Sequence, residues 1–324
     1  MRRREFIALL SGATVWPLAG AAQARTPLIG FMGNSTDALE ANLVASFRDG
    51  LRELGYEEGR NIAIKYVWAD GKYERFPTLV TELITAKVDV IVTAGTPAAL
   101  AVKQATTTVP LVMVAVGDPV GTGLVTNLAR PGENLTGLSS VAPDLEGKRL
   151  QLLQSVAPNL SRVAMFFNSL NPFHVSSMRQ AQSAAPALNI KLQPHDIRAS
   201  EDIDVAFVTL RKERPDGLFI LADRVFLHNR QRLMDFAREQ RLPSINAYEE
   251  LVEAGGLMSY GPSYEDMHKR AAVYVDKILK GTKPGNLPIE QPTKFTFIIN
   301  LRMAKELNVT VPPLVLGLAD RLIE

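Results

Sequence analysis

Short apolar segments alternate with longer amphipathic segments over most of this chain, and this alternation is what most limits its fold. Residues spaced for a helix follow the apolar run 26–33 after a loop and follow the run 88–95 directly. The run 109–117 is followed by a further strand pattern. Strands that alternate with helices of about a dozen residues pair in parallel and carry helices on both sheet faces. The sequence therefore predicts an α/β fold made of doubly wound parallel sheets.

The same alternation starts again after Pro143. Apolar or strand-like segments at 162–168, 190–197, 216–223 and 256–261 are separated by helical patterns. Two consecutive units of similar size, without sequence repetition, predict two doubly wound lobes. A single sheet of about ten strands is the alternative, and it is larger than most open sheets.

The C-terminal part is too short for a third domain. It has a long helical pattern at 264–281, a strand pattern at 294–300 and a short helical pattern at 301–307. We expect this tail to pass back to the first lobe and then to return to the second, because crossings between lobes form a hinge and a cleft. We assign residues 1–24 to an export signal, 25–142 and 261–291 to lobe 1, and 143–260 and 292–324 to lobe 2.

Residues 1–24 have the pattern of a cleaved export signal. Three arginines precede a short apolar stretch that ends in the A-x-A sequence of residues 22–24. A basic N-terminal helix is the alternative. Arg3 and Arg4, with the phenylalanine and isoleucine that follow, are similar to a twin-arginine motif, although Arg2 stands where Ser or Thr is usual. We expect an exported, periplasmic protein.

Charge and cysteine content exclude some classes of protein. Of the 36 Lys+Arg and 34 Asp+Glu residues, three arginines and one glutamate precede Arg25, so the remaining chain is formally neutral. The chain therefore has no basic excess that would indicate binding to nucleic acid or to an anionic membrane. The chain has no cysteine, so we expect no lipid anchor, and a core of this size needs no disulfides.

Ligands of open parallel sheets bind beyond the carboxyl ends of the strands, which selects three loops in the first lobe. Asn34 and Ser35 follow the first strand, where a helix cap is the alternative role. Gly95 and Thr96 end a strand where a helix starts, so they favour a ligand carboxylate, with a simple strand-to-helix turn as the alternative. Asp118 follows a long apolar strand and can meet a ligand ammonium or stabilise an Asp-Pro turn.

Five residues at equivalent loops make up the predicted site of the second lobe. They are Asn168, Asn171, Asp223, Asn246 and Tyr260. Asp223 is the preferred partner for a ligand ammonium group; the alternative is that it pairs with the next residue, an arginine, or caps the helix that follows.

Few aromatic residues are placed to hold a ligand ring. Tyr66, Trp68, Phe173 and Tyr248 lie near strand ends or helix starts, where packing is the commoner role.

We also expect the helix that follows the first strand to span residues 37–56 and to be capped by Ser35 or Thr36.

Motifs for catalysis and cofactors are missing. The chain has no cysteine nucleophile, no G-x-S-x-G sequence and no phosphate-binding P-loop. Its four histidines lack metal-ligand spacing. We therefore expect no catalytic residue, no metal and no cofactor.

Several segments together are similar to ABC-transporter substrate-binding proteins. These segments are 2–7, 93–125, 128–140, 271–284 and 287–307, which read RRREFI, TAGTPAALAVKQATTTVPLVMVAVGDPVGTGLV, LARPGENLTGLSS, AAVYVDKILKGTKP and LPIEQPTKFTFIINLRMAKEL. Gram-positive relatives of this family include tryptophan-binding lipoproteins, and the missing lipidation cysteine departs from them. The resemblance implies a type I periplasmic-binding fold with three crossing segments, a ligand held between the lobes, and amino acids, especially aromatic ones, as ligands.

These patterns favour a periplasmic receptor that closes on a small molecule and delivers it to an ABC permease in the inner membrane. We expect a monomer that captures an amino acid or an aromatic or organic acid. A ligand-sensing module for a membrane signalling partner is an alternative. An exported enzyme with Asp118 and Asp223 as acid and base is a third hypothesis, and the missing catalytic motifs argue against it.

Overall fold

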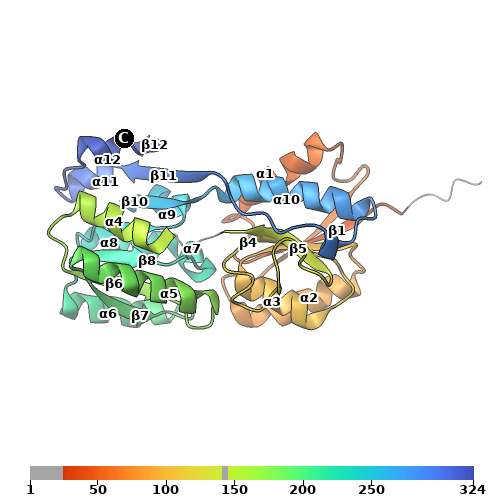
Figure 1. Cartoon of the computed structure of the whole chain (residues 1–324), viewed down its shortest axis with the longest axis horizontal. Helices are drawn as coiled ribbons and strands as arrows, with labels where there is room; N and C mark the ends of the chain where they lie inside the picture. Colours follow the sequence, from red (N-terminus) through yellow and green to blue (C-terminus); the bar gives the residue numbers. More distant parts are fainter. Residues whose placement is uncertain (1–24, 141–144) are drawn as a thin grey trace, which may run out of the picture.

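Two α/β lobes lie side by side in the computed structural model, which describes residues 25–140 and 145–324 (Figure 1). The export-signal prediction and the predicted lobe boundary at 142–143 lie outside these residues. Each lobe has its own sheet, of five strands in the order β2-β1-β3-β4-β5 and of seven strands in the order β12-β11-β10-β9-β8-β6-β7. The single ten-strand sheet is therefore wrong, and the doubly wound two-lobe fold is confirmed.

Lobe 1 contains the five-stranded sheet, and all of its strand pairs are parallel. Its central strands β3 and β4 are buried along their whole length, as continuous apolar runs covered on both faces must be. Its elements are β1 (Leu28–Gly33), α1 (Ala41–Glu53), β2 (Ala63–Trp68), η1 (Tyr73–Arg75), α2 (Phe76–Thr85), β3 (Val90–Ala94), α3 (Thr96–Ala105), β4 (Leu111–Val116), β5 (Leu135–Ser139) and, from the tail, α10 (Tyr264–Leu279) and η4 (Pro284–Asn286).

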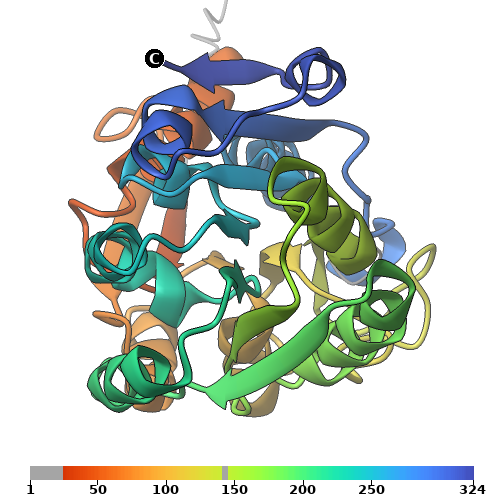
Figure 2. The same cartoon turned by 90° about the vertical axis from the view of Figure 1, so that its left-hand side faces the viewer.

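Lobe 2 contains the seven-stranded sheet, which Figure 2 shows from its own side of the molecule. One of its strand pairs, β10 with β11, is antiparallel. Its elements are α4 (Glu146–Val156), β6 (Arg162–Phe167), α5 (Phe173–Ala184), η3 (Ala185–Leu188), β7 (Lys191–Asp196), α6 (Asp202–Glu213), β8 (Gly217–Ile220), α7 (Arg224–His228), α8 (Arg230–Glu239), β9 (Ser244–Asn246), α9 (Glu249–Glu253), β10 (Met258–Pro262), β11 (Phe295–Asn300), α11 (Leu301–Glu306), α12 (Pro313–Leu316) and β12 (Arg321–Ile323).

Three segments connect the sheets. The chain leaves lobe 1 after β5, returns to it between β10 and α10, and leaves it again before β11. In the returning part, α10 packs along α1, and Glu290 accepts the backbone N–H of Ser139 beside β5.

The first helix differs from its prediction. It begins at Ala41 and not at residue 37, and neither Ser35 nor Thr36 caps it. The reason is Glu40, whose buried carboxylate accepts the backbone N–H groups of Asn34 at 2.9 Å and Ser35 at 2.7 Å. These bonds fold residues 34–40 back onto the end of β1, where backbone donors would otherwise be buried without partners.

Candidate functional site

A small cavity lies between the lobes at the carboxyl ends of the strands, where open parallel sheets place their ligands. It encloses about 20 Å³ of free space, which is room for about one water molecule. Its wall combines residues of both lobes and of the crossing segments: Tyr73, Gly95, Thr96, Pro97, Ala115, Gly117, Ser140, Asn171, Phe173, Ala222, Asp223, Arg224, Tyr248 and Tyr264.

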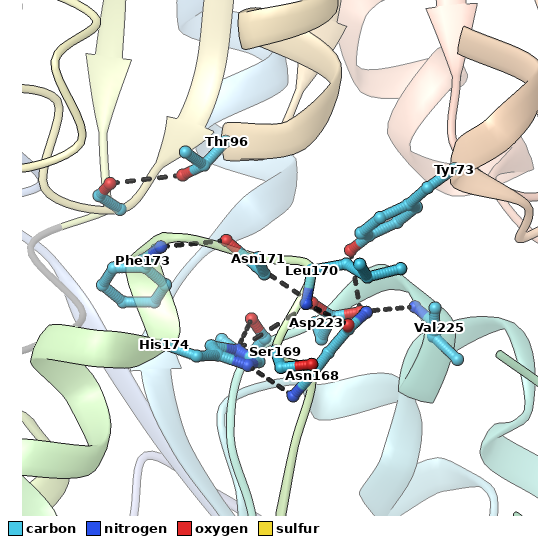
Figure 3. Close-up of polar contacts among 12 residues, drawn as sticks. Tyr73, Thr96, Asn168, Ser169, Leu170, Asn171, Phe173, His174, Asp223 and Val225 are labelled. Carbon is cyan, nitrogen blue, oxygen red and sulfur yellow. Dashed lines mark hydrogen bonds and ion pairs between the residues drawn. The ribbon is translucent and has the colours of Figure 1, made fainter. Parts of the chain in front are cut away.

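Asp223 is at the centre of the hydrogen bonds around this cavity (Figure 3). It follows β8, and its Oδ1 accepts the backbone N–H of Val225 at 3.0 Å, so it caps α7 as one sequence alternative proposed. Asn168 Nδ2 also donates to Oδ1, at 3.2 Å, and Asn171 Nδ2 donates to Oδ2, at 2.9 Å. With three donors from lobe 2 around it, the carboxylate is fixed in one orientation.

Tyr73 joins the first lobe to this cluster. Its hydroxyl donates to Asp223 Oδ1 at 2.8 Å across 150 residues of sequence, and the two side chains approach each other from opposite lobes in Figure 3. Burial raises the pKa of Tyr73 well above its ordinary value, with the charge of Asp223 acting in the same direction. The phenol therefore stays a neutral donor at every physiological pH.

A second interlobe bond lies beside the first. Ser35 Oγ and His228 Nδ1 are 2.7 Å apart. Gly71 packs under the imidazole with φ +74°, and a Cβ there would lie 2.7 Å from His228 Cγ. Burial lowers the pKa of His228, and the nearby Arg230 and Lys72 lower it further.

The start of α3 forms the lobe 1 wall of the cavity. Gly95 has φ +81°, a backbone conformation that glycine adopts without strain, and it ends β3 where the helix begins. Thr96 Oγ1 donates to the carbonyl oxygen of Gly117 at 3.2 Å, which ties the ends of two neighbouring strands together (Figure 3). The first backbone N–H groups of this helix have no partner within it, so its end carries partial positive charge.

Arg224 occupies the opposite wall and was not predicted from the sequence. Its side chain is 4% exposed, and Cζ lies 5.4 Å from the ring centre of Tyr248 and 5.2 Å from that of Tyr264. The two rings are themselves 4.7 Å apart. A guanidinium against two aromatic faces is stabilised by cation–π attraction.

The predicted site residues fall into three groups. Gly95, Thr96, Asn171 and Asp223 line the cavity. Asn168 supports Asp223, and Ser35 joins the lobes at their edge. The remaining predicted residues, Asn34, Asp118, Asn246 and Tyr260, are not part of the cavity wall.

Each of these four residues has a structural contact instead. Asp118 stabilises its own turn by accepting the N–H of Gly121 at 2.8 Å, which was the alternative role. Asn246 bridges the carbonyl of Met258 and the N–H of Tyr248. Asn34 Nδ2 donates to the carbonyl of Ala94, and Tyr260 packs against Phe295 and Phe297.

The four aromatic candidates divide evenly. Phe173 and Tyr248 line the cavity, whereas Tyr66 and Trp68 stack on each other at 6.2 Å along β2. Tyr73 and Tyr264 were missed although each starts a helix shortly after a strand, Tyr73 five residues beyond the end of β2 and Tyr264 two residues beyond the end of β10. Both follow short turn segments rich in polar or small residues, and that was the signal available.

Within residues 25–140 and 145–324, no three His, Asp or Glu side chains come together as a metal site. In the same part of the chain, no helix combines the length and apolar character needed to cross a bilayer.

Two parallel-sheet lobes that are connected by crossing segments and enclose a polar cavity define a two-lobed binding protein of the type I periplasmic class. A family model described as ABC transporter substrate binding protein matches residues 34–323, and the chain belongs to this family.

Known relatives agree with this assignment. The chain is 26% identical over 263 residues to a tyrosine-binding protein of Clostridioides difficile (strain R20291), covering 81% of this chain and 75% of that protein. A conserved domain protein from Vibrio cholerae has a TM-score of 0.86 at 29% identity, over 92% of this chain and 100% of that one. An ABC domain from Streptococcus pneumonia, in complex with L-Trp, has a TM-score of 0.85 at 23% identity, with the same coverage of both chains.

Proposed function

We propose that this protein is the periplasmic solute-binding component of an ABC importer and captures an amino acid or a related aromatic or organic acid between its lobes. The observation that carries the proposal is the interlobe cavity, whose wall is shared by both lobes and closed by the direct Tyr73–Asp223 and Ser35–His228 bonds. A wall shared between two hinged bodies is what a closing receptor requires.

Lobe movement is part of the proposed mechanism. The free space of about 20 Å³ is far below the several hundred Å³ typical of a small-molecule pocket. A ligand of amino-acid size therefore enters with the lobes apart, and closure then builds the wall around it. The interlobe bonds stabilise the closed form, which is the form that a permease in the inner membrane would recognise.

The chemistry of the wall supports a zwitterionic or acidic ligand. The start of α3 suits a carboxylate, and Asp223 Oδ2 has room for a donor besides Asn171. Phe173, Tyr248 and Tyr264 provide aromatic surface. One relative is named as a tyrosine-binding protein, and another is described in complex with L-Trp, which agrees with this ligand class.

Export is supported by the sequence. The arginines, apolar stretch and A-x-A sequence of residues 1–24 favour removal of a signal on passage to the periplasm, with the twin-arginine route indicated by Arg3 and Arg4.

A thermal-unfolding screen of the purified protein against amino acids, aromatic acids and small sugars tests the function. A ligand at about 100 times its Kd adds about 2.7 kcal/mol to the free energy of unfolding, which is a rise of several degrees in Tm. We expect one chemical class to raise the Tm and to be recovered unchanged. If no compound raises it, or if the ligand is consumed, the receptor function is contradicted.

A further inference from the structure

Arg224 is a buried cation with an unpaired hydrogen-bond donor. The guanidinium has five N–H donors, and its Nη2 is fully buried without a hydrogen-bond partner. Buried polar groups are nearly always hydrogen-bonded. The side chain is 4% exposed and lines the cavity between the lobes. A ligand group that accepts hydrogen bonds would resolve this imbalance.

The surrounding protein carboxylates do not fill this role. Glu40 and Glu250 act on Arg224 through their charge, and Glu250 Oε2 is itself buried without a hydrogen-bond partner. Glu40 Oε1 already accepts two backbone N–H groups, and burial raises the pKa of both glutamates. His268, also near Arg224, is buried, and burial lowers its pKa to about 4, so it adds no charge at neutral pH.

A second positive feature of lobe 1 faces Arg224. A Cβ on Gly95 would lie 3.8 Å from both Cγ and Nε of Arg224. The side chain therefore runs along the open face of Gly95, at the start of the ten-residue helix α3. This helix end carries partial positive charge. Closing the lobes thus brings two positive groups together, which is unfavourable unless an anion lies between them.

We propose that Arg224 and the start of α3 together bind the carboxylate of the ligand, so that a free carboxylate is required for tight binding. This inference rests on the proposed function and names the ligand group that the site selects. The planar guanidinium makes two parallel bonds to a carboxylate, and its orientation is fixed beforehand by Tyr248 and Tyr264.

The arrangement couples recognition to closure. Arg224 belongs to lobe 2 and α3 to lobe 1, so one carboxylate satisfies donors on both sides of the hinge. A neutral analogue leaves the guanidinium buried and unpaired next to a positive helix end. Such a ligand stabilises the closed form less, because an unpaired buried donor costs free energy that a paired one does not.

Acid–amide pairs test the proposal on the unmodified protein. Calorimetric affinities would be measured for L-tyrosine and L-tyrosinamide, L-tryptophan and L-tryptophanamide, and benzoate and benzamide. We expect an acid that binds to do so at least about tenfold more tightly than its amide, as loss of a charge-assisted hydrogen bond implies. Equal affinity within the pairs would overturn the proposal.

Variants locate the effect. Arg224→Gln should remove most of the preference for acid over amide, and Arg224→Lys should keep part of it because a single ammonium lacks the planar fork. Arg211→Gln is the matched control, since Arg211 also lies over a ring, that of Phe236 at 5.1 Å, but is half exposed. We expect that variant to bind as the wild type does. An Arg224→Gln variant that binds acids equally well, or better, would show that Arg224 does not hold the carboxylate.

These outcomes separate the two proposals. Tight binding of sugars or amides, without binding of acids, removes the carboxylate requirement and leaves the receptor function standing. No binding by any compound of the thermal screen contradicts the receptor function itself. If Arg224→Gln does not fold, as judged by circular dichroism, the comparison of acids with amides on the unmodified protein still decides the proposal.

Discussion

Asp223 has two roles that the sequence presented as alternatives. It caps α7 through Val225, and it lines the cavity in which a ligand ammonium would be placed. Both roles are possible because a carboxylate accepts about four hydrogen bonds on two oxygens. Oδ1 has three donors and Oδ2 has one, so the free capacity is on Oδ2.

Substitution of Asp223 separates these roles. Asp223→Ala should weaken an amine-bearing ligand tenfold or more and also destabilise the protein by about 1 kcal/mol through the lost cap. Asp223→Asn keeps an acceptor for the cap, so we expect weaker ligand binding with a smaller loss of stability. Calorimetry and urea unfolding measure the two effects, and unchanged affinity in both variants would remove Asp223 from the binding site.

Tyr73→Phe removes one hydroxyl and one interlobe bond. Because the bond goes to a charged acceptor, we expect a loss of ligand affinity of about 1.5–3 kcal/mol. The stability of lobe 2 should hardly change, since Asn168, Asn171 and Val225 still hold Asp223. Tyr66→Phe is the control, because its hydroxyl lies at the surface of lobe 1 beside Glu58. Equal ligand affinity of both variants and the wild type would show that the interlobe bond is not needed for binding.

Among the helices, α4 contains a completely buried ion pair. Glu146 and Arg149 are both 0% exposed and 2.9 Å apart. Arg149 Nε also donates to the carbonyl of Tyr260 in β10 at 2.7 Å. The pair thereby connects α4, which follows the first crossing segment, to β10, which precedes the second crossing segment. Burial raises the pKa of Glu146, although the adjacent Arg149 opposes this shift.

Arg149→Met should destabilise the protein by about 3–5 kcal/mol, because it leaves a buried carboxylate without its counter-charge. The double variant Glu146→Leu/Arg149→Met should recover most of this loss, since two apolar side chains leave no buried charge. Arg52→Met is the matched control, because Arg52 pairs with Asp49 at the same i,i+3 spacing but at the surface. We expect this variant to lose less than about 1 kcal/mol of the free energy of unfolding. Urea unfolding measures all three variants, and a double variant as unstable as the single one contradicts the argument.

The turn before η1 meets the end of α7 at His228, and we expect this contact to depend on pH. Burial, Arg230 and Lys72 lower the pKa of His228 when the lobes are closed, whereas an imidazole exposed by opening has its ordinary pKa of about 6.5. The neutral His228 side chain therefore contributes fully to lobe closure above about pH 6.5, and this contribution is lost as the pH falls through the lowered pKa of the closed form. Ligand affinity should therefore decrease on acidification.

Calorimetric affinities between pH 8 and pH 5 test this expectation. His228→Gln can still bond to Ser35 but does not titrate, so its affinity should change less with pH than that of the wild type. His195→Gln is the control: burial also lowers the pKa of His195, but it lies on β7 near Glu213, outside the cavity wall. Identical pH profiles for the wild type and His228→Gln would contradict a role for His228 in closure.

For the whole molecule, the three crossing segments predict a rotation of one lobe against the other. The cavity is too small for an amino acid with the lobes as they stand, so exchange of a ligand requires opening. X-ray scattering should give a smaller radius of gyration with the ligand that raises the Tm than without it. An unchanged radius at saturating ligand, under conditions where calorimetry shows binding, would rule out a hinge mechanism.

The parallel α/β lobes and the edge of each sheet that faces the cavity could be predicted from the order of the amino acids, because apolar periodicity and strand-to-helix alternation are local properties. Gly95, Thr96, Asn171 and Asp223 could be placed near the cavity from the sequence because strand ends mark that edge; their contact with a ligand stays a prediction. The antiparallel pairing of β11 and the added strand β12 were not predicted, since pairing partners are distant in sequence.

Contacts between the lobes were decided only by the tertiary structure. Tyr73 meets Asp223 over 150 residues, and Ser35 meets His228 over 193. No periodicity encodes such pairs, because they depend on how two separately folded bodies are rotated about the hinge. The same rotation places Arg224 between an aromatic pair and the start of α3, while Asp118 and Asn246 bond to their own loops. Residue type and position at a strand end predicted which groups could be available for binding, and the packing of the lobes determined which of them face the cavity.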